Sequence, residues 1–301
     1  MRNLAILVCV TFLCQAGCQK PAPLTVEPPA APPAGTLSVT VLANPDTNIA
    51  VNPIDSVGVL PTDQTNYSGF FLVNSVKYDY GHGAISGASA SAYFGDRNRP
   101  LVVNGKIVGY YGLDLMPSAV FPLKIGGIPL VRFPYKIHVG NRDTTFGSIY
   151  RAPAYFLATI QPQTRYDWDD PGPDTTRLMP FKDSVVTPED LTVLAPPGGS
   201  ILSRLKPVEL HWKGNGNISI IVSSYNLLTG KTKPILQLQP AVNTGSAVIE
   251  PHVLQLLPQT KYFVFTFIIA NKGDRPLGGL SVNDRILVQA ASVYNSYVQF
   301  Q

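Results

Sequence analysis

Apolar and polar residues alternate over short segments from residue 37 onward, with the period of two that half-buried β-strands show. Such segments occur at 37–42 and 70–78. Two more, 101–103 and 106–111, flank Asn104-Gly105, a dipeptide that strongly favours a β-hairpin. Further strands are expected at 119–125, 128–139 and 154–160. No window sustains a helical period of 3.6 residues, so we predict an antiparallel β-sandwich or an open barrel over residues 37–160.

A second β region begins near residue 189. Its clearest strand places Phe263, Phe265 and Phe267 on one face, with Tyr262 and Val264 on the other. A last strand is expected over 286–293. The alternation predicts a second β domain over residues 189–301, and the fold class of the whole chain is therefore all-β.

Three motifs in this second region resemble those of a fibronectin type III domain. The segment 208–212, VELHW, resembles the second strand with its buried tryptophan, here Trp212. The segment 218–225 resembles the third strand. Residues 257–262, LPQTKY, resemble the entrance to the sixth strand, with the leucine offset by one position. The resemblance implies a fibronectin type III or immunoglobulin-like sandwich in which Tyr262 is the tyrosine corner, bonded to backbone upstream.

The amino terminus has the pattern of a secretory signal: Arg2, then the apolar segment 4–13, then small residues. Because the run ends on Ala-Gly-Cys, it resembles a bacterial lipoprotein signal, and the resemblance implies that Cys18 becomes the lipidated first residue. Gln15 departs from the pattern, which usually has Leu, Val or Ile there. Cleavage without lipidation, or retention as an anchor, are the alternatives, although a membrane span needs about 20 apolar residues.

Residues 18–36 are rich in proline and alanine and favour an extended tether. A polar connection rich in aspartate and proline is expected between the two β regions. The predicted organisation is a signal peptide (1–17), a tether (18–36), an N-terminal β domain (37–160), an acidic connection (161–188) and a fibronectin type III or Ig-like domain (189–301). This layout resembles lipoproteins of the Bacteroidota type.

Charge and cysteine content narrow the function classes. The formal net charge is +4, but Lys and Arg are scattered singly, whereas nucleic-acid binding requires a concentrated basic patch. We therefore expect no nucleic-acid partner. All three cysteines lie in the leader or at its end, so the rest of the chain has no thiol for a disulfide, a nucleophile or a zinc site.

A recognisable catalytic motif is missing from the sequence. Ser86 lies one position too late for a Gly-x-Ser-x-Gly elbow. The four histidines, His82, His138, His211 and His252, form neither an HExxH pair nor a metal-ligand spacing. We therefore expect no catalytic residue, no cofactor and no enzymatic activity.

Two groups of residues are candidates for ligand contact. Four carboxylates, Asp167, Asp169, Asp170 and Asp174, lie close together in the sequence and are weak candidates for calcium binding, because the EF-hand order fails and a solvated acidic loop is the favoured explanation. Trp168 among them could stack on a sugar or pack at the domain junction. Tyr78 and Tyr80 are candidate contact aromatics, since exposed tyrosine often anchors binding surfaces.

The features together predict a lipid-anchored protein of the bacterial cell envelope. We expect it in the outer membrane, facing either the periplasm or the cell surface. We expect a non-catalytic binding or scaffolding module for a glycan or a protein. One alternative is a lipid-tethered, glycan-processing hydrolase that uses distant carboxylates. Another is a structural subunit of a surface assembly, joined through unpaired strand edges.

Overall fold

Strands make up most of the described chain, which confirms the all-β prediction. The structure is a computed structural model and describes residues 36–42, 67, 69–103, 106–112, 123–139, 142–153, 160–170, 181–276 and 285–301. Its strands are β1 (Leu37–Val41), β2 (Gly69–Asp79), β3 (Ala84–Val103), β4 (Lys106–Gly112), β5 (Lys124–Ile125), β6 (Ile128–Pro129), β7 (Val131–Val139), β8 (Arg142–Arg151), β9 (Arg165–Asp170), β10 (Phe181–Val186), β11 (Thr192–Ala195), β12 (Ile201–Leu202), β13 (Val208–Lys213), β14 (Ile218–Asn226), β15 (Lys231–Pro240), β16 (Ser246–Ile249), β17 (Tyr262–Pro276) and β18 (Arg285–Phe300). One short helix, α4 (Pro251–Leu254), precedes β17.

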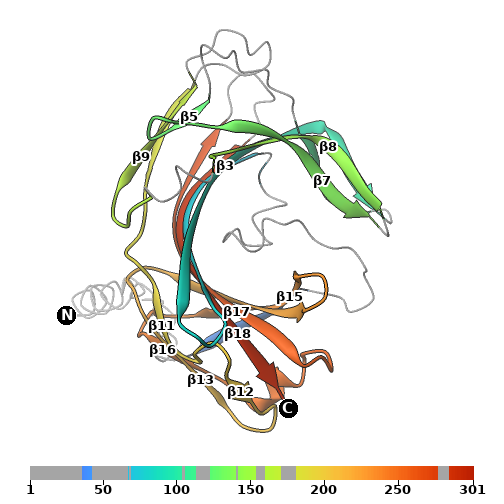
Figure 1. The fold of residues 1–301 in the computed structure, drawn as a ribbon, viewed down its shortest axis with the longest axis vertical. Helices are drawn as coiled ribbons and strands as arrows, with labels where there is room; N and C mark the ends of the chain where they lie inside the picture. Colours follow the sequence, from blue (N-terminus) through green and yellow to red (C-terminus); the bar gives the residue numbers. More distant parts are fainter. Residues whose placement is uncertain are drawn as a thin grey trace, which may run out of the picture. The chain divides into compact units, whose positions relative to one another are not determined.

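One long sheet organises these strands, in the order β1-β15-β14-β17-β18-β2-β3-β8-β7, with β4 and β12 paired at its side. At its centre β18 pairs with β2 in parallel, from Ile286 opposite Gly69 to Ser296 opposite Asp79. Figure 1 shows these early (teal) and late (red) strands running side by side. The other pairs in this strand order are antiparallel, whereas β12 at the side pairs with β18 in parallel.

Two smaller sheets cover one face of the long sheet and make it a sandwich. The three-stranded sheet β11-β13-β16 packs against β14, β17 and β18 around a core that contains Leu210, Trp212 and Phe265. The four-stranded sheet β10-β9-β5-β6 packs against β2, β3 and β18 around a second core that contains Phe71 and Trp168. Burial of these large apolar side chains is the main favourable contribution to folding.

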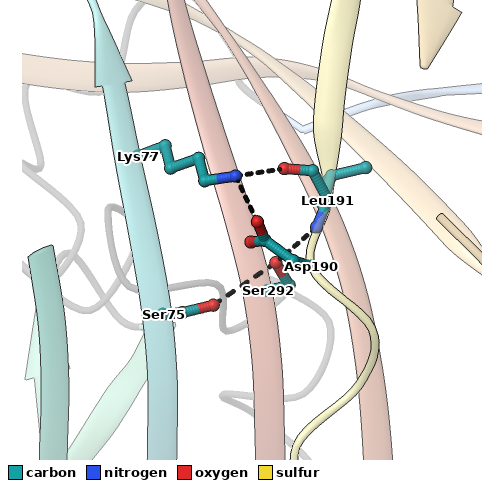
Figure 2. A network of polar contacts seen from close by, with 5 residues as sticks. All are labelled: Ser75, Lys77, Asp190, Leu191 and Ser292. Carbon is teal, nitrogen blue, oxygen red and sulfur yellow. Dashed lines mark hydrogen bonds and ion pairs between the residues drawn. The ribbon is translucent and has the colours of Figure 1, made fainter. Parts of the chain in front are cut away.

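A polar belt separates the two cores on that face (Figure 2). Lys77 Nζ lies 2.6 Å from Asp190 Oδ2 and donates to the Leu191 carbonyl at 3.1 Å. The Ser292 hydroxyl accepts a hydrogen bond from the Leu191 amide at 2.9 Å and lies 3.3 Å from the Ser75 hydroxyl. The belt therefore ties the chain just before β11 to both β2 and β18.

The division of the chain differs from the two separate domains that we expected. A single compact unit extends from Pro33 to Gln301, and the parallel joint of β2 and β18 carries one sheet across the expected boundary. β1, expected in the N-terminal domain, pairs with β15 instead. A pattern of alternation marks strands but carries no information on their partners, because pairing is a long-range property.

Much of the expected acidic connection is also strand. β9 and β10 pair along their whole length, and Tyr166, Trp168 and Val185 point into the core. The alternation of these apolar residues with aspartates is the signature of a half-buried strand. The intervening residues 171–180 lie outside the described part of the chain.

Candidate functional site

Five side chains form a tyrosine patch on the face of the long sheet opposite the two small sheets: Tyr78, Tyr80, Ile85, Tyr225 and Tyr297. The rings of Tyr80 and Tyr297 stack with centroids 4.2 Å apart and an interplanar angle of 25°. Tyr225 meets Tyr297 edge-on at 5.1 Å and 75°. Ile85 lies opposite Tyr78 in the β2–β3 ladder. Tyr80 is 47% exposed and Ile85 64%, so the patch presents apolar surface to solvent.

A buried carboxylate next to Tyr80 fixes the position of the patch. Asp79 accepts hydrogen bonds from the amides of Gly81 and Gly198, each at 2.9 Å, and from the Tyr294 hydroxyl at 3.0 Å. A Cβ atom at Gly198 would collide with the Asp79 backbone. Next to it, the Gly199 amide donates to the Tyr297 carbonyl at 2.7 Å. The ends of β2 and β18 are thus held together by the loop before β12.

The hydrogen bonds at Asp79 also set its charge. Burial alone would raise the pKa of Asp79, but the bonds from Gly198, Gly81 and Tyr294 outweigh burial and lower it. Burial and the Asp79 carboxylate raise the pKa of Tyr294 to about 12. Asp79 is therefore an ionised acceptor at neutral pH, while Tyr294 stays a neutral donor.

Burial also affects two tyrosines of the patch, Tyr78 and Tyr297. The pKa of Tyr297 is raised first by burial and then by its hydrogen bond with Tyr80, and burial followed by the neighbouring Tyr80 raises the pKa of Tyr78. These two rings are therefore uncharged near pH 7.

Farther along the same face lies an open cavity of about 340 Å³, which we call the amide pocket. It is lined by Asn217, Ser219, Gln239, Ile268, Ala270 and Lys272. Ser219 lies opposite Ile268 in the β14–β17 ladder. Between the pocket and the patch, the Thr266 hydroxyl donates to Asn295 Oδ1 at 2.7 Å, and both side chains are buried.

The structure distributes the residues singled out from the sequence over separate places. Tyr78 and Tyr80 belong to the patch. Trp168 is fully buried against Phe71, with ring centroids 4.4 Å apart, so it packs in the core and presents no ring face to solvent. Cys18 lies outside the described residues.

The calcium site suggested for the aspartates of 167–174 stays a prediction, and Asp167 is the one among them whose side chain the structure describes. Asp167 is exposed and lies 2.8 Å from Arg165 Nε, while Asp169 and Asp170 are successive residues of β9 and Asp174 is outside the described residues. Among the described residues, no three His, Cys, Asp or Glu side chains are grouped to hold a metal ion.

The fibronectin resemblance implies structural roles for Trp212 and Tyr262, and their surroundings differ. Trp212 is buried, and its Nε1 donates to Asn243 Oδ1 at 2.8 Å. Tyr262 begins β17, where the Lys261 ammonium lies 5.6 Å from its ring centre. The backbone upstream is bound by Arg204, whose guanidinium donates to the carbonyls of Leu257, Pro258 and Thr260.

Tyr225, Tyr297 and the amide pocket were not found from the sequence. Tyr297 lies two positions beyond Asn295 and Tyr225 two beyond Ser223, so both share the face of Tyr78. The alternation within each strand gives this signal, but only the pairing of β2, β14 and β18 shows that the rings meet.

No protein-family model matches the chain, and no curated protein matches it. Among solved structures, the yeast delta-COP-I mu-homology domain aligns with 78% of this chain and 98% of its own, at 8% sequence identity and a TM-score of 0.20. Similarity at this level supports no conclusion about function. Within the described residues, no helix has the length and apolar character needed to span a membrane.

Proposed function

We propose that this chain is a lipid-anchored protein of the bacterial cell envelope that acts as a non-catalytic binding module, and that the tyrosine patch contacts a protein ligand. The observation that carries this proposal is the stack of Tyr80 on Tyr297 beside exposed Ile85. Exposed aromatic side chains on a rigid support are typical anchors of protein interfaces, because they bury much apolar area at little entropic cost.

The geometry favours a protein over a sugar at this patch. Tyr297 uses one ring face on Tyr80 and meets Tyr225 edge-on, whereas a sugar needs a ring face open for stacking. The exposed side chain of Leu228, in the hairpin that follows Tyr225, adds apolar area. A partner of matching apolar surface would bury these groups together.

Site-specific photocrosslinking in intact cells tests this function. A photoreactive residue in place of Tyr80 is expected to give a discrete protein adduct, and Tyr225→Ala is expected to weaken that adduct several-fold by removing a packed ring. The matched control places the same residue at Val248, an exposed strand position in β16. Equal adducts at both positions, or none at Tyr80, would contradict the proposal.

The lipid anchor has its own test. Cys18→Ser is expected to release the protein from the membrane fraction, since the thiol carries the acyl chains in the lipoprotein interpretation. Cys14→Ser is the matched control and should leave the protein in the membrane fraction. If the Cys18→Ser variant fractionates like the unaltered protein, the anchor lies elsewhere.

We also propose that residues 189–301 form a fibronectin type III-like sandwich. Support comes from the strand order: β11, β13 and β16 form one sheet, and β15, β14, β17 and β18 lie in the facing one. The buried Trp212 on β13 and the phenylalanines of β17 fill the space between them. The extension of the second sheet through β2 distinguishes this sandwich from a free-standing one.

A further inference from the structure

We propose that Tyr80 and Tyr297 form a site of oxidative crosslinking, at which a one-electron oxidant joins their rings as dityrosine. The oxidant class that fits is a haem peroxidase using hydrogen peroxide, which takes one electron from each phenol. The arrangement of the rings carries this inference, since they stack with centroids 4.2 Å apart and an interplanar angle of 25°. The inference does not depend on the protein ligand proposed above.

The hydroxyl groups of the pair provide the alignment that coupling requires. Tyr297 and Tyr80 are joined by a side-chain hydrogen bond between their hydroxyls. Phenoxyl radicals couple at the ring carbons next to the oxygen, so a hydrogen bond between two hydroxyls brings the reacting carbons together. Proximity fixed in this way turns an encounter between two molecules into a step within one. The geometry therefore favours coupling within one chain over coupling between chains.

The proposed step conserves atoms and electrons. Each phenol loses its hydroxyl proton and one electron, and hydrogen peroxide takes up both protons and both electrons to become two molecules of water. A carbon–carbon bond then forms between the two rings, next to each oxygen. The hydrogen on each joined carbon moves to the oxygen and restores the hydroxyl, so the protein loses two hydrogen atoms in all.

Exposure to solvent separates this pair from another close pair of tyrosines. Tyr93 and Tyr135 have ring centroids 4.8 Å apart, but their side chains are buried, at 6% and 4% exposure. The Tyr93 hydroxyl also donates to the backbone carbonyl of Tyr110. Tyr80, directly after β2, is 47% exposed, so a diffusing oxidant can reach its ring. Oxidation of the folded protein is therefore expected at Tyr80 and not at the buried pair.

Tyr225 is the competing partner within the patch. Its ring lies 5.1 Å from that of Tyr297 at an interplanar angle of 75°. In such a T-shaped pair the edge of one ring meets the face of the other, so the carbons beside the two hydroxyls do not face each other. The two neighbours of Tyr297 thus differ in geometry, which makes Tyr225 the matched control for Tyr80.

A dityrosine at this place would tie the end of β2 covalently to β18. These strands pair in parallel although they come from opposite ends of the described chain. Residues 33–301 contain no cysteine, so a disulfide cannot serve this purpose. A covalent link between distant segments lowers the entropy of the unfolded chain, and it is therefore expected to raise the unfolding temperature.

Peroxidase treatment of the full-length protein in detergent tests the site. With a haem peroxidase and hydrogen peroxide, dityrosine fluorescence is expected in the monomeric protein. Trypsin should release residues 78–97 linked to 286–301, at a mass two hydrogen atoms below the sum of the two peptides. Tyr80→Phe and Tyr297→Phe should each remove this linked pair, because phenylalanine keeps the ring but has no phenolic hydroxyl. Tyr225→Phe should leave it in place.

Thermal unfolding before and after oxidation separates the crosslink from a general effect on the fold. Oxidation should raise the unfolding temperature of the unaltered protein and of Tyr225→Phe, but not that of Tyr80→Phe. The inference would be overturned by the absence of dityrosine under conditions that couple free tyrosine, by links found only between two molecules, or by an equal yield in Tyr80→Phe. A link from 286–301 to 214–231 would overturn it as well, since that peptide carries Tyr225.

Discussion

At the scale of single residues, the Asp79 carboxylate is a buried charge with hydrogen-bond partners from separate segments. It joins three parts of the chain through hydrogen bonds from Gly81, Gly198 and Tyr294. A hydrogen bond to a buried charge stabilises the fold more than a bond between two neutral groups does. Without the charge, the amides of Gly81 and Gly198 would face a poorer acceptor.

Asp79→Asn is expected to lower the free energy of unfolding by about 2–4 kcal/mol, because one amide hydrogen would face the backbone donors. The measurement is urea unfolding at pH 7, with Asp167→Asn as the control at an exposed aspartate. A loss below about 0.5 kcal/mol, within the range of ordinary surface substitutions, would show that the hydrogen bonds of Asp79 contribute little to stability.

The same residue gives a pH dependence. Since the pKa of Asp79 is lowered in the folded state, its contribution is fully present above the unfolded value of about 3.9 and is lost as pH falls through the folded pKa. Between pH 4 and 2, the unaltered protein is therefore expected to lose stability more steeply than Asp79→Asn. Parallel pH profiles would contradict this assignment.

The sequence supports some residue-level predictions and not others. Tyr78 and Tyr80 stand out as aromatics at the end of a strand, and both lie in the patch. Two roles were expected for Trp168, stacking on a sugar or packing, and the buried ring has the packed role. The aspartates beside it indicate solvent only for their own face of β9, whereas Trp168 alternates with them and shares the core face with Tyr166.

At the scale of elements, Arg204 holds the turn between α4 and β17. Its guanidinium donates to four carbonyls and lies over the rings of Phe263 and Phe300, and burial lowers its pKa. The planar fork satisfies carbonyls that the end of a short helix leaves open.

Arg204→Met is expected to destabilise the fold by about 2–3 kcal/mol, because the carbonyls lose their donors while the apolar stem is kept. Chemical unfolding measures this, and Lys206→Met, at an exposed cation two positions on, is the control. Equal stability of the two variants would mean that water replaces the guanidinium without cost.

Most expected strands are present, but β3 and β18 extend well past the segments expected over 101–103 and 286–293. The strands predicted over 70–78 and 218–225 correspond to β2 and β14, and the expected hairpin at 104–105 lies between paired β3 and β4. The partners of these strands could not be predicted from the sequence. The alternation of side chains determines which face of a strand is buried, but it does not determine which strand lies next to it.

At the scale of the whole molecule, the parallel pairing of β2 and β18 makes the two expected domains interdependent. A fragment of residues 189–301 is expected to be aggregation-prone and to unfold at a lower temperature than residues 33–301. It would expose the edge of β18 along the stretch that β2 covers. Size-exclusion chromatography and thermal unfolding of both fragments measure this, and a monomeric fragment with an unchanged unfolding temperature would show two autonomous domains.

The same pairing constrains when the chain can fold. β18 lies between β17 and β2 in the sheet, so β2 and β3, although synthesised early, lack their central neighbour until β18 has been made. Contacts between such distant segments slow folding and keep a partly synthesised chain open. The long sheet is therefore completed late, when β18 pairs with β2 and β17.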